Sequence, residues 1–211
     1  MSAGPKSWAG VAVLATALAG CALPERPSRG TLYDFGPGPT AALAPAPAAT
    51  PVALAAIDTA GALDGSAMLY RLGYADAQQL RPYAQARWSM RPAELVGQRL
   101  RERLGRYRPV LQTAEGAALA RTGGRMPLVL RLDLEEFSHW FASPADSSGL
   151  VRVRATVLES TAGGERLLAQ RTLVAQRPAA SADASGGARA LAAATDALAE
   201  ELEQWLRGLG P

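Results

Sequence analysis

Residues 128–135 read LVLRLDLE, with a leucine at every second position. Side chains of a β-strand alternate between its two faces, so this spacing predicts a strand that buries one face. Residues 151–157 repeat the alternation, and a turn at 162–165 leads to a third predicted strand at 166–176. We therefore expect residues 127–176 to form an antiparallel meander with one polar face.

One helix is predicted before this meander in the sequence and one after it. Pro92 suits the first turn of a helix, and apolar residues recur at helical spacing from there to about Arg106. A second helix is predicted at residues 188–209, with an apolar stripe formed by Leu191, Ala194, Leu198, Leu202 and Trp205 or Leu206. Short strands are expected at residues 52–57, 67–74 and 110–112. Together these elements predict a two-layer α+β domain, with helices packed on one face of a mostly antiparallel sheet.

The chain divides into three segments by composition. Residues 1–20 have the layout of a secretory signal, residues 21–51 are rich in Pro, Ala and Gly, and residues 52–211 carry the periodic patterns. We expect the middle segment to be a tether, in which residues 31–35 are a candidate edge strand of the domain. The folded part has roughly 160 residues, which is enough for one core.

The N-terminal apolar run is too short to cross a membrane. Lys6 is followed by an uncharged stretch at residues 7–19, whereas a membrane-spanning helix needs ~20 mostly apolar residues. The run ends in LAGC at residues 18–21, which resembles a bacterial lipobox. This resemblance implies a diacylglyceryl group on the Cys21 sulfur, cleavage just before Cys21, and acylation of the new amine. The alternative is an ordinary signal peptide that leaves a free thiol.

The residue following the cysteine bears on the destination of a lipoprotein. Lipoproteins that stay in the inner membrane of Gram-negative bacteria often carry Asp there, and this chain has Ala22. We therefore expect a lipid-anchored protein on the periplasmic face of the outer membrane. The several acyl chains implied by lipoprotein processing would make such an anchor durable, whereas one chain holds a protein only marginally.

The composition excludes several kinds of chemistry. The chain has one Cys, one His and one Lys, so neither a disulfide nor a zinc site built from Cys and His can form within it. Its 22 basic and 19 acidic residues are interspersed, which argues against a nucleic-acid-binding stripe. We expect no cofactor other than the covalent lipid on Cys21.

No catalytic constellation is visible. A serine triad would need His139 to be paired with a carboxylate and an activated serine, and the chain has no G-x-S-x-G element. We expect His139 to lie in a loop or at the end of a strand. Glu135 and Glu136 are adjacent on a strand and therefore point to opposite faces unless a bulge intervenes, so we interpret them as surface residues. These patterns favour a protein that is not an enzyme.

Arginines and aromatic residues supply the candidate partner-binding positions. Arg99, Arg103 and Arg106 share one face of the first long helix, and they would suit an acidic partner or lipid head groups. The alternative, which we favour, is a solvent-exposed helix face without a binding role, on which Glu102 pairs with Arg106. The aromatic residues between the second strand and this helix are either core or partner anchors, with core packing favoured. The candidate contact residues are Tyr70, Arg71, Trp88, Arg99, Arg103 and Arg106.

The order of these segments resembles a known family. The residues that carry the resemblance are MLYR at 68–71, Tyr83, Arg87, Trp88, Pro92 and LRERL at 100–104. With the lipobox, the early Tyr33–Phe35 patch, the meander and the terminal helix, they resemble the ABC-type transport auxiliary lipoproteins, the group that contains the PqiC (YmbA) proteins. The resemblance implies a non-enzymatic outer-membrane lipoprotein.

The resemblance further implies that the protein works with a periplasmic MCE-domain protein, and often with an ABC permease and ATPase, in moving phospholipids between the two membranes. The resemblance also raises assembly into a homo-oligomeric ring. The alternative function is a regulator of envelope assembly that activates a cell-wall synthase or a secretion complex. An envelope hydrolase is disfavoured because the sequence shows no catalytic site.

Overall fold

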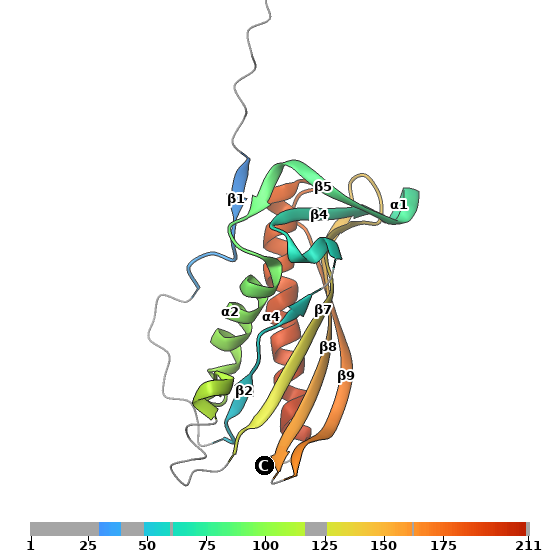
Figure 1. Ribbon diagram of the computed structural model, residues 1–211. Helices are drawn as coiled ribbons and strands as arrows, with labels where there is room; N and C mark the ends of the chain where they lie inside the picture. The colour runs from blue at the N-terminus through green and yellow to red at the C-terminus, as the bar shows by residue number, and fades with distance from the viewer. Residues whose placement is uncertain (1–29, 39–48, 60, 117–125, 162, 210–211) are drawn as a thin grey trace, which may run out of the picture.

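The computed structural model describes residues 30–38, 49–59, 61–116, 126–161 and 163–209. Within these ranges nine strands form one mixed sheet, and two long helices lie beside it (Figure 1). The α+β class is therefore confirmed. Cys21, the lipobox-like residues 18–21 and the predicted secretory signal lie outside the described residues.

The predicted meander is present, and its three strands are longer than their sequence patterns indicated. It consists of β7 (Leu128–Phe141), β8 (Ser147–Thr161) and β9 (Gly164–Pro178), each antiparallel to the next. On β8 the side chains of Val151, Val153, Ala155 and Val157 are all 0% exposed, whereas those of Arg152 and Arg154 are exposed. This alternation is what the period-two pattern predicted.

The rest of the sheet corrects the expectation of a mostly antiparallel arrangement. Three short strands pair in parallel with successive parts of β7, because the chain runs along one edge of that long strand. They are β2 (Val52–Leu54), β3 (Asp58–Thr59) and β4 (Ala67–Leu72). Two more parallel pairs join β1 (Thr31–Tyr33) to β5 (Ala77–Trp88), and β6 (Val110–Leu111) to β2. By contrast, β4 and β5 pair antiparallel with each other.

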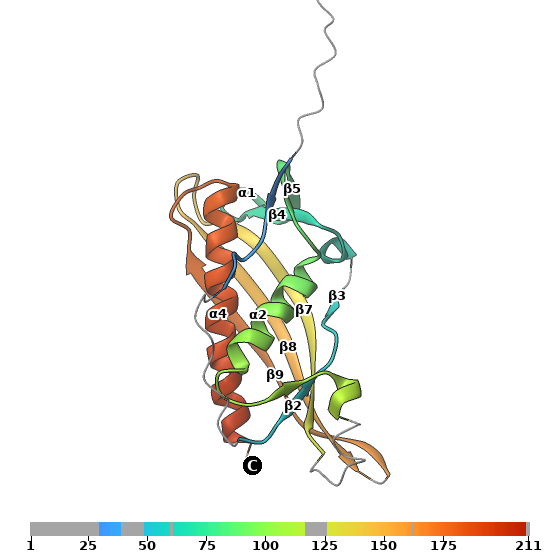
Figure 2. The ribbon, with the colours of Figure 1, turned by 90° about the vertical axis from the view of Figure 1, so that its left-hand side faces the viewer.

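The long helices are α2 (Pro92–Leu104) and α4 (Ala184–Gly208). Figure 2 shows them side by side over the same face of β7, β8 and β9, with α4 running the length of the sheet. Leu191, Ala194, Leu198, Leu202 and Leu206 of α4 are all fully buried, as the predicted stripe requires. The remaining described helical segments are η1 (Gly61–Asp64), α1 (Gly73–Asp76) and residues 113–116. No helix in the described part of the chain is both long and apolar enough to span a membrane.

Helix α4 begins four residues before the predicted start. Asp183 caps it by accepting a 2.7 Å hydrogen bond from the backbone N–H of Gly186. Gly186 and Gly187 lie in the first turn of this helix, where their neighbours leave no room for a side chain. A Cβ on Gly186 would lie 2.0 Å from the Ser181 carbonyl oxygen, and one on Gly187 would lie 2.5 Å from Nδ1 of His139.

The segment before Val52 also belongs to the folded domain. The candidate edge strand is present as β1, and the ring of Phe35 lies 5.9 Å from the ring of Trp88 and 6.1 Å from that of Phe137. We call residues 31–38 the N-terminal strap. In Figure 2 the strap passes from β1 to the region between α2 and α4. The domain therefore starts about twenty residues earlier than the composition indicated.

Candidate interaction site

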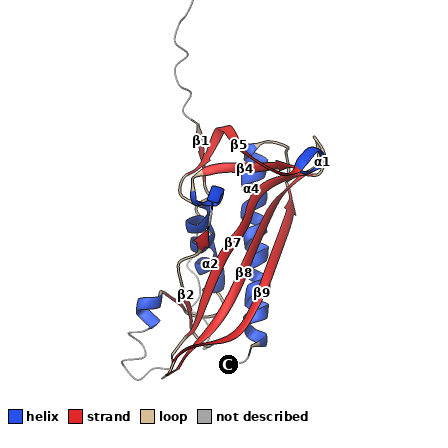
Figure 3. Cartoon of the chain, turned by 45° about the vertical axis from the view of Figure 1, so that its right-hand side comes forward, coloured by secondary structure: helices blue, strands red, loops and turns tan. Residues whose placement is uncertain are grey.

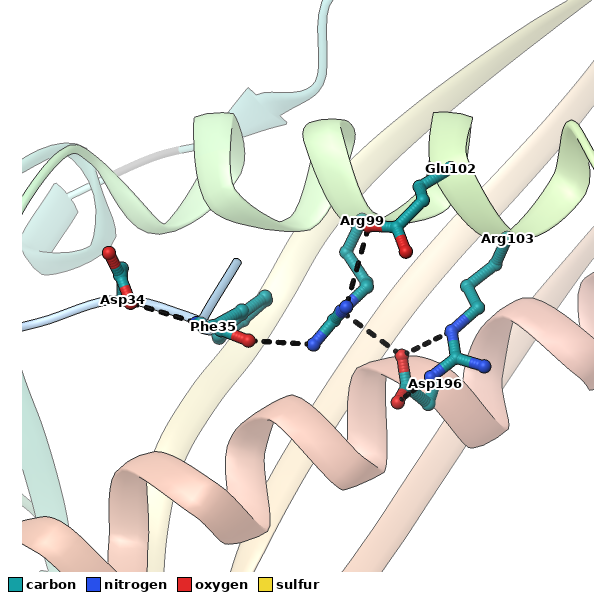
Figure 4. A network of polar contacts seen from close by, with 7 residues as sticks. Asp34, Phe35, Arg99, Glu102, Arg103 and Asp196 are labelled. Carbon is teal, nitrogen blue, oxygen red and sulfur yellow. Dashed lines mark hydrogen bonds and ion pairs between the residues drawn. The ribbon is translucent and has the colours of Figure 1, made fainter. Parts of the chain in front are cut away.

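The arginines of α2 are turned toward the rest of the molecule. Only 8% of Arg99 is exposed, and its Nε lies 3.2 Å from Oδ1 of Asp196 on α4. Its Nη2 donates a 2.8 Å hydrogen bond to the carbonyl oxygen of Phe35 in the strap, and its Nη1 lies 3.4 Å from Oε2 of Glu102 (Figure 4). One guanidinium group thus joins α2, α4 and the strap.

Arg103 binds the same aspartate. Its Nε donates to Oδ1 of Asp196 at 2.9 Å, and its Nη2 donates to Oδ2, so Asp196 receives hydrogen bonds from Arg103 and an ion pair from Arg99 (Figure 4). Glu102 pairs with Arg99 rather than with Arg106, which differs from the predicted support of Arg106. Arg106 is half-buried, and its Nε has no hydrogen-bond partner among the described residues. Arg99 and Arg103 therefore hold the helices together instead of forming a solvated face.

Trp88 is a core residue. It is 2% exposed, and its ring packs edge-on against Phe35 at 85° and tilted against Phe137 at a centroid distance of 5.4 Å. The core interpretation of this tryptophan is confirmed. A partner cannot reach it while the domain is folded in this way.

Tyr70 and Arg71 tie β4 to its neighbours. The half-buried ring of Tyr70 lies 4.7 Å from the ring of Tyr83 on β5. Arg71 forms an ion pair with Glu136 of β7, with 2.9 Å between Nη2 and Oε2, and its Nη1 donates to the carbonyls of Ala77 and Gln78. The surface interpretation of Glu136 is wrong, since its side chain is only 15% exposed. A register shift between Leu134 and Glu136 is the bulge that lets this carboxylate turn toward Arg71.

His139 lies near the end of β7, as expected, but it is buried. Its side chain is 0% exposed, and its Nδ1 lies 2.8 Å from the hydroxyl of Tyr83. Burial lowers the pKa of His139 to about 4, although the negative charge of Asp183 opposes this shift. Burial also raises the pKa of the Tyr83 hydroxyl, with a smaller contribution from Tyr70 and Asp183. The imidazole is therefore neutral at pH 7 and serves as part of the packing.

Two shallow pockets flank the strap and remain open to solvent. One, of about 370 Å³, lies between the strap and α2; the other, of about 320 Å³, lies between the strap and α4. The first is lined by Asp34, Phe35, Gly36, Pro37, Met90, Leu95, Gln98, Arg99 and Glu102. Leu32, which lines the second, is 66% exposed, and Met90 is 36% exposed. We take the strap and its pockets as the candidate interaction site, which the sequence could not reveal because it arises from packing between distant segments.

Among the described residues, no group of three or more His, Cys, Asp or Glu side chains is placed so that it could hold a metal ion. A family model described as the ABC-type transport auxiliary lipoprotein component matches residues 33–203. The chain therefore belongs to this family. The match begins within the strap, which agrees with the place of that segment in the domain.

Solved structures share this fold at low sequence identity. Protein XCC0632 from Xanthomonas campestris, assigned to family DUF330, is 22% identical with a TM-score of 0.65, and the match covers 86% of this chain and 97% of that one. The hypothetical protein CT253 from Chlamydia trachomatis is 14% identical with a TM-score of 0.50, covering 77% and 98% respectively. An uncharacterized protein is 9% identical with a TM-score of 0.59, covering 84% and 99%. No curated protein matches the chain.

Proposed function

We propose that this protein is a non-enzymatic, outer-membrane lipoprotein that docks a periplasmic lipid-transport conduit at the outer membrane. The observation that carries the proposal is the family match over residues 33–203, downstream of LAGC at 18–21. The conduit partner would be an MCE-domain protein, acting with an ABC permease and ATPase on phospholipids. The periplasmic face of the outer membrane is the proposed location.

Tethering explains how a small domain could serve this role. A lipid on Cys21 would confine the domain near the membrane, which raises its effective concentration for a weak docking contact. Because Arg99 and Arg103 bind groups within the domain, other side chains must make that contact. Met90, beside the pocket between the strap and α2, is an exposed apolar group of the kind that anchors interfaces.

Co-purification tests the docking partner. The tagged full-length protein is extracted in detergent from membranes of its own host, and the recovered proteins are identified by mass spectrometry. We expect an MCE-domain protein, and we expect Met90→Asp to reduce its recovery. Arg166→Asp on exposed β9 is the matched control. Recovery of a cell-wall synthase instead, together with intact outer-membrane permeability in a deletion strain, would support the regulator and sink the transport proposal.

The lipid anchor has a separate test. Wild-type protein should incorporate labelled palmitate, and Cys21→Ser should abolish the labelling and leave an uncleaved or soluble species. Labelling that is unchanged in Cys21→Ser would refute the anchor. Ring assembly is tested by the mass of the detergent-solubilised protein, where a monomer alone would contradict it.

A further inference from the structure

The chain enters the domain at one end of its long axis. In Figures 1 and 3, β1, β4, β5 and α1 gather at one end of the domain, while the C-terminal end of α4 and the β8–β9 turn lie at the opposite end. We call these the entry end and the far end. Only residues 22–29 separate Cys21 from Gly30, the first described residue of the domain.

The length of this connection limits how the domain can stand on a membrane. Nine Cα–Cα steps from Cys21 to Gly30 span at most ~30 Å when fully extended. Helix α4 has 25 residues and runs the length of the domain, which sets a long axis of about 37 Å at 1.5 Å per residue. The connection is therefore shorter than the domain, and the domain cannot invert so that only its far end meets the membrane.

The side chains of the entry end suit a lipid surface. Leu32 on β1 is 66% exposed and Tyr74 on α1 is 48% exposed, and tyrosine is a residue that favours the boundary between lipid and water. Arg81 and Arg87 on β5 have no acidic partner among the described residues, and the Nε of Arg81 donates a 2.5 Å hydrogen bond to Oε1 of Gln79. Asp76 is the acidic residue of α1, which connects β4 to β5. Its carboxylate accepts a 2.9 Å hydrogen bond from the backbone N–H of Gln78.

We propose that the entry end lies against the phospholipid headgroups of the membrane that holds Cys21, with Leu32 and Tyr74 at the lipid boundary and Arg81 and Arg87 facing phosphate. Guanidinium groups bind phosphate oxygens well, and anionic lipid adds a favourable potential. This orientation rests on the proposed lipid anchor. It directs the far end, where Leu167 of β9 is 59% exposed, toward the periplasm.

Fluorescence quenching by labelled lipid tests this orientation. The full-length lipidated protein is reconstituted into vesicles of phosphatidylethanolamine and phosphatidylglycerol that contain a headgroup spin label. Cys21 is the only natural cysteine, and its sulfur is blocked by lipid, so a fluorophore reacts only with an introduced cysteine. The three single variants are Ala84→Cys on β5, Thr172→Cys on the middle of β9, and Gln204→Cys near the end of α4, all at exposed positions.

We expect quenching at position 84 to be several-fold stronger than at 172 or 204. Equal quenching at all three positions, or stronger quenching at 172 or 204, overturns the orientation. Flotation of the vesicles separates this failure from failure of the anchor: if the wild-type protein does not float with the lipid, the anchor is wrong, and if it floats without the quenching difference, the orientation is wrong.

Charge removal tests the role of the two arginines. We expect Arg81→Gln combined with Arg87→Gln to lower quenching at position 84 several-fold. Arg166→Gln with Arg171→Gln, the same loss of charge on β9, should leave it unchanged. If the first pair has no effect, or if both pairs lower it equally, contact between Arg81, Arg87 and phosphate is refuted.

Discussion

Arg108 and Glu203 form an ion pair that is almost completely removed from water. Their side chains are 5% and 1% exposed, and the guanidinium group binds both carboxylate oxygens, at 2.8 and 3.0 Å. The pair joins the segment after α2 to α4. A bidentate geometry offsets the cost of burying two charges, but loss of one partner leaves the other charge buried and uncompensated.

Replacing the Glu203 carboxylate by a neutral group should therefore destabilise the fold strongly. We expect Glu203→Gln to lower the free energy of unfolding by about 3 kcal/mol in urea denaturation. Glu159→Gln removes the same charge from the exposed pair with Arg166 and should change stability by less than about 1 kcal/mol. Similar effects of both variants would show that burial does not decide the strength of the Arg108–Glu203 pair.

The single histidine predicts a dependence of stability on pH. In the folded state the pKa of His139 is about 4, below the ordinary value of 6.5, because its side chain is buried. Between these values the unfolded chain binds a proton that the folded chain does not, so stability falls as the pH drops from 6.5 toward 4, by on the order of 2 kcal/mol. NMR titration should show this imidazole still neutral at pH 5. A pKa near 6.5 would contradict its burial.

For single residues, the sequence predicted positions on a helix or strand but not the partners that each side chain contacts. It placed Arg99 and Arg103 on one face of a helix, and that placement was right. It could not show that Asp196, more than ninety residues away, lies opposite them, because charge pairing between distant helices leaves no local pattern. The burial of His139 was missed for the same reason, since Gly187 and Tyr83 come from elements far along the chain.

Close packing between α4 and β8 depends on a glycine. A Cβ on Gly149 of β8 would lie 2.4 Å from backbone atoms of Ala190 and Leu191. We expect Gly149→Ala to lower the free energy of unfolding by about 3 kcal/mol, because backbone cannot move aside as a flexible side chain can. Gly208→Ala, where a Cβ would meet nothing within 4 Å, should leave stability unchanged or raise it by up to about 1 kcal/mol. Thermal denaturation of both variants checks this contrast.

Elements with strong local periodicity were predicted well. The meander and α2 follow from their apolar spacing, and α2 begins at Pro92 as expected. Strand β5 was missed because its sequence is mostly polar and exposed and contains Pro82, which disfavours an interior strand. The parallel pairing of β2, β3 and β4 with β7 was missed because pairing partners are not encoded in the strand's own periodicity.

The strap contributes to the stability of the whole domain. Phe35 packs on Trp88 and Phe137, and the carbonyl of Phe35 accepts a hydrogen bond from Arg99. We expect Phe35→Ala to lower the free energy of unfolding by about 2 kcal/mol. This loss is smaller than for a fully buried phenylalanine, because the ring of Phe35 is half-buried. Leu32→Ala, at a 66% exposed side chain on the same strap, should change it by less than about 0.5 kcal/mol. Equal stability of the two variants in urea would show that the strap is not part of the cooperative unit.

The strap also affects the order in which the domain can fold. Its strand β1 pairs with residues 86–88, and Ala188 and Ala192 of the last helix line the pocket beside it. The first folded segment thus completes its contacts only when the end of the chain is available. Folds dominated by contacts between distant residues form in milliseconds to seconds rather than microseconds. A chain emerging N-terminus first would therefore keep its strap unsettled until synthesis or translocation had delivered α4.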